Sequence, residues 1–199
     1  ETGVRETVRI DGETIITKDD YLSGRFYDDS VCYSFYPIDL HIKTGVKRDG
    51  TLTAQQVTIE WDAGAYVTTN PRVDYNAGFA ANGPYKLPNA QVDGYVYMTN
   101  KTLGTAYRGF GVTEVATAHE RQMDLIAERL GMDPLELRLK NVLRNGDTGI
   151  TGETMQTMAV AECLEGPAAN VDWNALPDRW VDEEGNLCGK GIACFNKLT

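Results

Sequence analysis

The sequence is poor in the residues that build disulfide scaffolds and self-contained metal sites. Its 199 residues include only four cysteines, none spaced as Cys-x-x-Cys, and two histidines, His41 and His119, that lie far apart. This scarcity argues against a disulfide-rich secreted fold and against a zinc or iron–sulfur site built from this chain alone. We therefore predict no metal-ligating residue, and we expect reduced thiols, as in a cytoplasmic protein.

The chain also lacks a long apolar run and an excess of positive charge. It has no stretch of about 18 apolar residues, so no transmembrane helix is predicted. It carries 29 acidic and 19 basic residues, a net charge of −10. Such a charge disfavours a nucleic-acid backbone or an anionic membrane as partner. The composition is otherwise that of a globular protein, with 42% hydrophobic residues.

The first half of the chain shows the alternation typical of strands. Residues 1–20 alternate weakly about Asp11-Gly12, which predicts a hairpin. Residues 38–46 alternate cleanly and are followed by a tight turn and a return strand that ends near Trp61. The alternation slips at Gln55-Gln56, which either a β-bulge or a crossing of two sheets would explain. Residues 62–90 are rich in turn formers and are predicted to be bends, and another strand follows around residues 92–98.

Helical periodicity dominates the second half. Apolar residues recur on one helical face from Val112 to Leu130, and Gly131 is a typical helix stop. Asp133-Pro134 has the N-cap and N1 residues of a second helix, a third is predicted near residues 155–169, and residues 191–195 are predicted to form a strand. The predicted fold class is therefore α+β, with mixed β-sheet hairpins in the first half and helices packed on them in the second half.

The candidate site is the segment Arg108-Gly109-Phe110-Gly111, which lies between a predicted strand and a predicted helix. The two glycines allow the backbone to approach a ligand closely, and the helix start offers N–H groups and the positive end of its dipole to an anion. Arg108 adds a fixed charge, and Phe110 adds a flat face for a planar substrate. On spacing alone, a tight turn with a salt-bridged arginine explains the pattern too.

Several segments, in order, resemble the molybdenum-cofactor-binding subunit of the xanthine dehydrogenase/aldehyde oxidase family. The resemblance covers residues 42–199, so this chain is similar to a fragment of a larger molybdopterin-binding domain. The resembling segments are Lys43 to Ala54, Asp62 to Tyr66, Gly83 to Asn89, Thr99-Asn100, Ala106 to Gly111, Leu130 to Arg138 with Lys140-Asn141, and Gly146 to Thr148.

The resemblance implies a parent enzyme that hydroxylates an aldehyde or an N-heterocycle, with water as the oxygen source. Its cofactor would be molybdopterin, and its electrons would pass to iron–sulfur and FAD subunits or domains. By carry-over, Arg108, Gly109 and Gly111 contact the cofactor, and Phe110 packs against a small planar substrate.

Departures from the family pattern imply that the isolated chain is inactive and need not hold the cofactor. The family's glycine-rich cofactor loop and the glutamate that serves as general base are absent, so no catalytic residue is assigned. Xanthine-oxidising members have an arginine where this chain has Asn76, which disfavours a purine substrate. Glu120 matches a family glutamate but is expected to lie on the helix surface or in a structural ion pair.

Residues 1–41 resemble a segment of FAD-dependent oxidoreductases instead, most clearly at Ser34 to His41. We therefore expect two parts, an N-terminal segment 1–41 and a partial molybdopterin-binding domain 42–199. The alternatives to a molybdenum hydroxylase fragment are a part of an FAD-dependent oxidoreductase and a non-catalytic fold fragment.

Overall fold

The computed structural model describes residues 4–10, 13–18, 38–104, 106 and 108–196. Within these ranges, five strands form one sheet in the order β2-β1-β3-β4-β5, and two short strands form a separate hairpin. The strands are β1 (Val4–Ile10), β2 (Glu13–Lys18), β3 (Ile38–Val46), β4 (Leu52–Gly64), β5 (Ala90–Met98), β6 (Arg179–Val181) and β7 (Leu187–Gly189). The helices are α1 (Asn70–Ala80), α2 (Val112–Leu130), α3 (Pro134–Asn141) and α4 (Val160–Asn170).

The large sheet is built from two hairpins and one added strand. β1 pairs with β2 and β3 pairs with β4, in both cases antiparallel, as the alternation predicts. The hairpins join through a parallel pairing of β1 with β3, and β5 adds to β4, again in parallel. This arrangement, with helices packed on it, confirms the predicted α+β fold class. β3 runs without a break across residues 41 and 42, and the division of the chain at this point stays a prediction.

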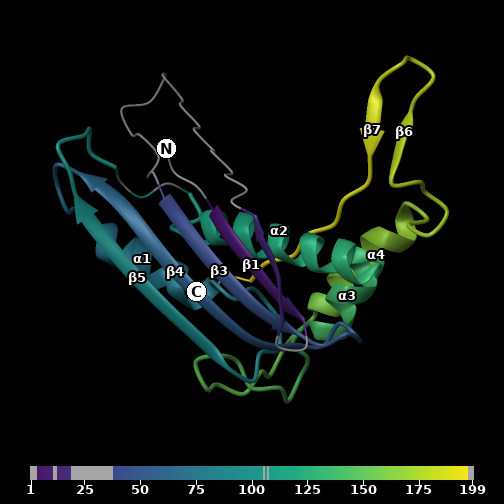
Figure 1. Cartoon of the computed structure of the whole chain (residues 1–199), viewed down its shortest axis with the longest axis horizontal. Helices are drawn as coiled ribbons and strands as arrows, with labels where there is room; N and C mark the ends of the chain where they lie inside the picture. Colours follow the sequence, from purple (N-terminus) through teal and green to yellow (C-terminus); the bar gives the residue numbers. More distant parts are fainter. Residues whose placement is uncertain (1–3, 11–12, 19–37, 105, 107, 197–199) are drawn as a thin grey trace.

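One face of the sheet is covered by α1 and α2 (Figure 1). The alternating residues of β3 and β4 point into this layer, and Trp61 is 1% exposed there. Their contacts with α1 and the start of α2 make the first hydrophobic cluster, whose buried members are Leu40, Ile42, Val57, Ile59, Trp61, Val73, Ala77, Ala80, Ala81, Val112, Val115 and Ala118. This cluster holds α1 and the first turns of α2 in fixed positions on the sheet.

A second cluster lies at the other end of α2, where α3 and α4 pack. The start of α3 is capped as predicted, because the Asp133 carboxylate accepts hydrogen bonds from the backbone N–H groups of Leu135 and Glu136, at 2.8 and 3.1 Å. The β6–β7 hairpin projects away from both clusters (Figure 1). Among the described residues, no helix combines the length and the apolar character needed to cross a bilayer.

Four local predictions need correction. The segment 62–90 is not only bends, because α1 occupies Asn70–Ala80. The irregularity in the β3–β4 pairing lies opposite Gly45 and Val46, where Thr53 is the extra residue, and not at Gln55-Gln56. The third predicted helix is α4, which begins at Val160 and not near residue 155. Residues 191–195 form no strand, and the late strands are β6 and β7 instead.

Candidate functional site

The candidate loop, defined as Arg108 to Gly111, connects the region after β5 to the first turn of α2. Three consecutive residues adopt positive φ angles, at 110° for Gly109, 57° for Phe110 and 92° for Gly111. Glycine takes these values freely, whereas a phenylalanine at positive φ is strained. Thr105 and Tyr107 lie outside the described residues. The two glycines therefore allow an unusual loop backbone. Phe110 also adopts a positive φ, although it has a side chain.

Arg108 is exposed at the start of this loop. Within the described part of the chain, its guanidinium has no hydrogen-bond or ion-pair partner, so the salt bridge required by the alternative interpretation is not present there. Gly111 is the N-cap of α2 and has no side chain with which to cap the helix. An anion near this helix start would meet an unpaired cation and the positive end of the helix dipole.

Glu114 adds a negative charge near the start of α2. It lies in the first turn of α2, and its carboxylate accepts a hydrogen bond of 2.8 Å from the Thr113 hydroxyl. A carboxylate in the first turn is itself favourable to the helix dipole. It also reduces the attraction of the helix start for a second anion, which leaves Arg108 as the principal cation of the loop.

Phe110 is half-buried and packs against the first hydrophobic cluster. Its backbone carbonyl accepts a hydrogen bond of 2.6 Å from the side-chain amide of Asn76 on α1. Gly111 is so close to α1 that an added Cβ would lie 2.6 Å from the Val73 carbonyl oxygen. The predicted site residues are thus brought together in one short loop that is held against α1.

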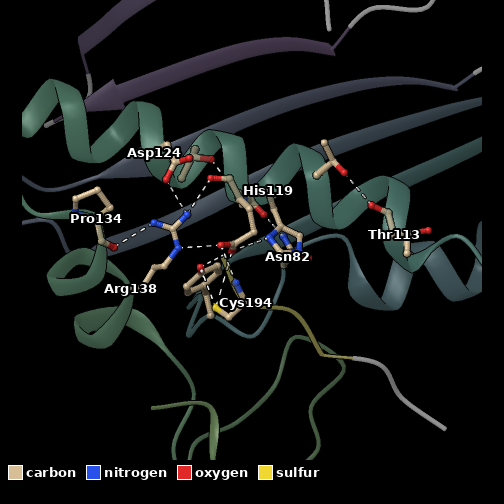
Figure 2. A network of polar contacts seen from close by, with 12 residues as sticks. Asn82, Thr113, His119, Asp124, Pro134, Arg138 and Cys194 are labelled. Atoms are coloured by element: carbon tan, nitrogen blue, oxygen red, sulfur yellow. Dashed lines mark hydrogen bonds and ion pairs between the residues drawn. The ribbon is translucent and has the colours of Figure 1, made fainter. Parts of the chain in front are cut away.

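A second polar cluster, which sequence reasoning treated only as a possible ion pair, is centred on Glu120 of α2. Glu120 is 7% exposed, and Arg138 on α3 is fully buried. Arg138 donates from Nε to Glu120 Oε2 at 2.8 Å, and its other nitrogens donate to Asp124 Oδ1 and the Pro134 carbonyl. Figure 2 shows Arg138 reaching from α3 towards Asp124 on α2.

Three further groups surround the same carboxylate. The Tyr85 hydroxyl donates to Glu120 Oε1 at 2.5 Å, and the Cys194 backbone N–H donates to Oε2 at 2.9 Å. His119 Nδ1 lies 3.2 Å from Oε1. The cluster therefore ties α2, α3, the segment around Tyr85 and the end of the described chain to one buried charge.

The pKa values of this cluster reflect burial and opposite charge. Burial by itself would raise the pKa of Glu120, but the His119 hydrogen bond and the Arg138 charge outweigh it and lower the pKa below its usual 4.5. Burial, with the nearby Glu120 charge, raises the pKa of Tyr85 well above 10 and that of the Cys194 thiol to about 11. Glu120 is thus an ionised structural anchor, as the ion-pair interpretation predicts, and Cys194 is a protonated thiol.

Among the described residues, no group of three or more histidine, cysteine, aspartate or glutamate side chains is placed to hold a metal ion. The chemistry of the candidate loop is accordingly that of a positive charge, backbone groups and an aromatic ring.

Comparison with known proteins relates the chain to molybdopterin-binding proteins. Residues 34–142 match the molybdopterin cofactor-binding domain family. The chain is 39% identical over 131 residues to the nicotinate dehydrogenase large molybdopterin subunit of Eubacterium barkeri, and it covers 31% of that protein with 65% of its own length. It is 35% identical to the aldehyde oxidoreductase of Megalodesulfovibrio gigas, with 65% of this chain and 14% of that protein covered.

Solved structures give the same result. The aldehyde oxidoreductase of Desulfovibrio gigas superposes with a TM-score of 0.67 at 32% identity, over 71% of this chain and 16% of that one. Quinoline 2-oxidoreductase of Pseudomonas putida 86 gives a TM-score of 0.66 at 26% identity, over 72% of this chain and 19% of that one. The chain thus spans less than a third of the length of each of these relatives.

The family match covers more than half of the chain and includes the candidate loop, both hairpin strands β3 and β4, and the Glu120–Arg138 pair. The relatives are molybdopterin-binding subunits and oxidoreductases of the xanthine dehydrogenase and aldehyde oxidoreductase type. This chain therefore belongs to the molybdopterin cofactor-binding domain family of molybdenum hydroxylases.

Proposed function

We propose that this chain is part of the large subunit of a molybdenum hydroxylase, in which the loop Arg108 to Gly111 borders the cofactor and the substrate. The observation that carries the proposal is the combination of an exposed Arg108, which has no partner among the described residues, with a helix start whose N-cap is Gly111. A cation beside the N–H groups of a helix start fits the anionic groups of a pyranopterin cofactor. The half-buried Phe110 ring beside them fits a planar substrate.

When bound, the molybdopterin cofactor supplies the oxidation, a hydroxylation of carbon next to nitrogen or oxygen with water as the oxygen source. The chain's own residues bind and orient. Arg108 holds an anionic oxygen through charge-assisted hydrogen bonds, and the positive φ angles of Gly109 and Gly111 bring backbone groups close to it. Phe110 limits the substrate to flat molecules that stack on its ring.

The substrate class we propose is an aldehyde or an N-heterocycle other than a purine. Relatives of this chain carry the names nicotinate dehydrogenase, aldehyde oxidoreductase and quinoline 2-oxidoreductase. A purine is disfavoured because position 76 holds the neutral Asn76, whose amide is already bonded to the loop. Electrons would leave through iron–sulfur and FAD partners. Because the chain spans less than a third of its relatives, we propose that turnover needs the rest of the subunit.

The test is Arg108→Ala in the full-length enzyme, with Arg121→Ala as the matched control. Arg121 is an exposed arginine on α2. Loss of one preorganised donor next to the reacting centre is expected to lower turnover by about 100- to 1000-fold. Because Arg108 is exposed, the melting temperature is expected to change little. The measurements are turnover, molybdenum content by mass spectrometry and thermal unfolding.

The control variant is expected to match the unmodified enzyme in all three measurements. An Arg108→Ala enzyme that keeps normal turnover and molybdenum content while folded would end the assignment of this loop to the cofactor site. A large fall in melting temperature with unchanged turnover would show that Arg108 serves the fold instead.

A further inference from the structure

The candidate loop is held against α1 by two features that lie on one face of that helix. Val73 and Ala77 are one helical turn apart and are both buried. An added Cβ on Gly111 would lie 2.6 Å from the Val73 carbonyl oxygen and 3.0 Å from the Ala77 Cβ. The loop backbone therefore rests directly on α1, and Asn76 lies between these two contact residues.

Asn76 makes the second contact, and it is polar and directional. Its Nδ2 atom donates to the Phe110 carbonyl oxygen at 2.6 Å, across 34 positions of sequence. Among the described residues, no other donor to this oxygen is found. Asn76 is half-buried, so water compensates only in part for the loss of this donor.

The bonded carbonyl belongs to the strained residue of the loop. Phe110 has a φ of 57°, and a residue with a side chain keeps such a conformation only where its surroundings impose it. Rotation of Phe110 to a relaxed φ would turn its carbonyl away from Asn76 and would move its ring. The hydrogen bond from Asn76 therefore opposes the relaxation that would displace Phe110 and the neighbouring Arg108.

We propose that Asn76 is a positioning residue, which holds Phe110 in its left-handed conformation and so fixes the ring and Arg108 in the orientation that the site needs. The effect on catalysis rests on the function proposed above, whereas the positioning itself does not. Because one N–H of the Asn76 amide is committed to the Phe110 carbonyl, we assign Asn76 a role that acts through Phe110. Asn76 then affects substrate specificity indirectly, through the positions of the Phe110 ring and of Arg108.

The first test observes Phe110 in this chain without any activity measurement. Phe110 is replaced by 4-fluorophenylalanine, and its ¹⁹F resonance is recorded in the unmodified chain, in Asn76→Ala and in Asn76→Asp. A single narrow resonance is expected for the unmodified chain from pH 4.5 to 7.5. Asn76→Ala is expected to shift and broaden it, because nothing then opposes relaxation of the loop.

Asn76→Asp provides the conservative rescue. In this variant, the protonated carboxyl group at position 76 donates O–H to the Phe110 carbonyl, whereas the ionised carboxylate repels it. The contact therefore raises the pKa of this carboxyl above about 3.9. The unmodified ¹⁹F resonance is expected at low pH, and the Asn76→Ala resonance above the raised pKa. Asn174→Asp, at an exposed position, is expected to show no such change.

The outcomes separate the two proposals. A ¹⁹F resonance that is the same in all variants and at all pH values overturns the inference about Asn76, whatever Arg108→Ala does. If Asn76→Ala does not fold, the pH dependence of Asn76→Asp decides the matter by itself. In the full-length enzyme, Asn76→Ala is expected to lower kcat/KM by about 10- to 100-fold, as expected for a displaced binding group. A shifted resonance with normal kcat/KM would keep the positioning role and would refute the proposed function of the loop.

Discussion

The replacement Glu120→Gln is the most informative test of how this chain holds together. It preserves the shape of the side chain but removes its charge and places an NH₂ group where one carboxylate oxygen stood. In the unmodified chain, Glu120 Oε1 accepts a hydrogen bond from Tyr85, and Oε2 accepts hydrogen bonds from Arg138 and from the Cys194 backbone. With its NH₂ group at the Oε2 position the amide faces the Arg138 and Cys194 donors, whereas at the Oε1 position it faces the Tyr85 hydroxyl, which can also accept. In either orientation the fully buried Arg138 loses its main counter-charge.

The expected loss of stability follows from these contacts. Removal of one partner of a buried ion pair typically costs about 3–5 kcal/mol. The lower end applies here, because Arg138 keeps Asp124 and the Pro134 and Glu120 carbonyls as acceptors. A loss of about 3 kcal/mol corresponds to a fall of about 6–12 °C in melting temperature for a chain of this size.

The assay is urea unfolding followed by circular dichroism, with Glu128→Gln as the control. Glu128 is an exposed glutamate on the same helix, and its replacement is expected to change stability by about 0.5 kcal/mol or less. Pairing Glu120→Gln with Arg138→Met should cost less than the sum of the single changes, because no unpaired charge then remains. A Glu120→Gln chain as stable as the control would refute the anchoring role.

Three further outcomes are expected. The pKa of Glu120 is lower in the folded chain than its usual 4.5, so the ionised carboxylate contributes its full stabilisation above pH 4.5. This stabilisation is lost as the pH falls through the pKa of Glu120 in the folded chain. The free energy of unfolding should therefore fall more steeply with acid in the unmodified chain than in Glu120→Gln. Gly83→Ala should cost about 2 kcal/mol more than Gly185→Ala in thermal unfolding, since both have positive φ but only at Gly83 would a Cβ meet His119, at 2.7 Å. At pH 8, the exposed Cys163 should react with a thiol reagent before Cys194, which is half-buried and whose pKa is raised to about 11; equal rates would contradict this assignment.

The elements that sequence reasoning predicted well are those whose signal is local. β3 alternates cleanly, and α2 carries a long apolar face that ends at Gly131. α1 escaped prediction because its buried face is made of the small or short residues Val73, Ala77 and Ala80 within a segment rich in turn formers. Pro71, the second residue of α1, was the one signal that marked its start.

The polar interior was less predictable, because its partners are distant in sequence. Arg138 is 18 residues from Glu120, and Cys194 is 74 residues from it. Nothing local distinguishes a buried ion pair from two surface charges. In the loop, the glycines predicted a tight backbone, but the positive φ of Phe110 and its bond to Asn76 depend on how α1 packs.

The mixed pairing of the large sheet also suggests an order in which its strands pair during folding. The antiparallel β3 and β4 are joined by a turn of five residues, whereas the parallel β4 and β5 are separated by 25 residues that include α1. For a flexible chain, closing the longer connection costs about 1.4 kcal/mol more in entropy than closing the shorter one. We therefore expect the β3–β4 hairpin to form first and β5 to add to it later. Asn76 and the candidate loop lie on opposite sides of β5 in the sequence, so we expect their contact to form late in folding.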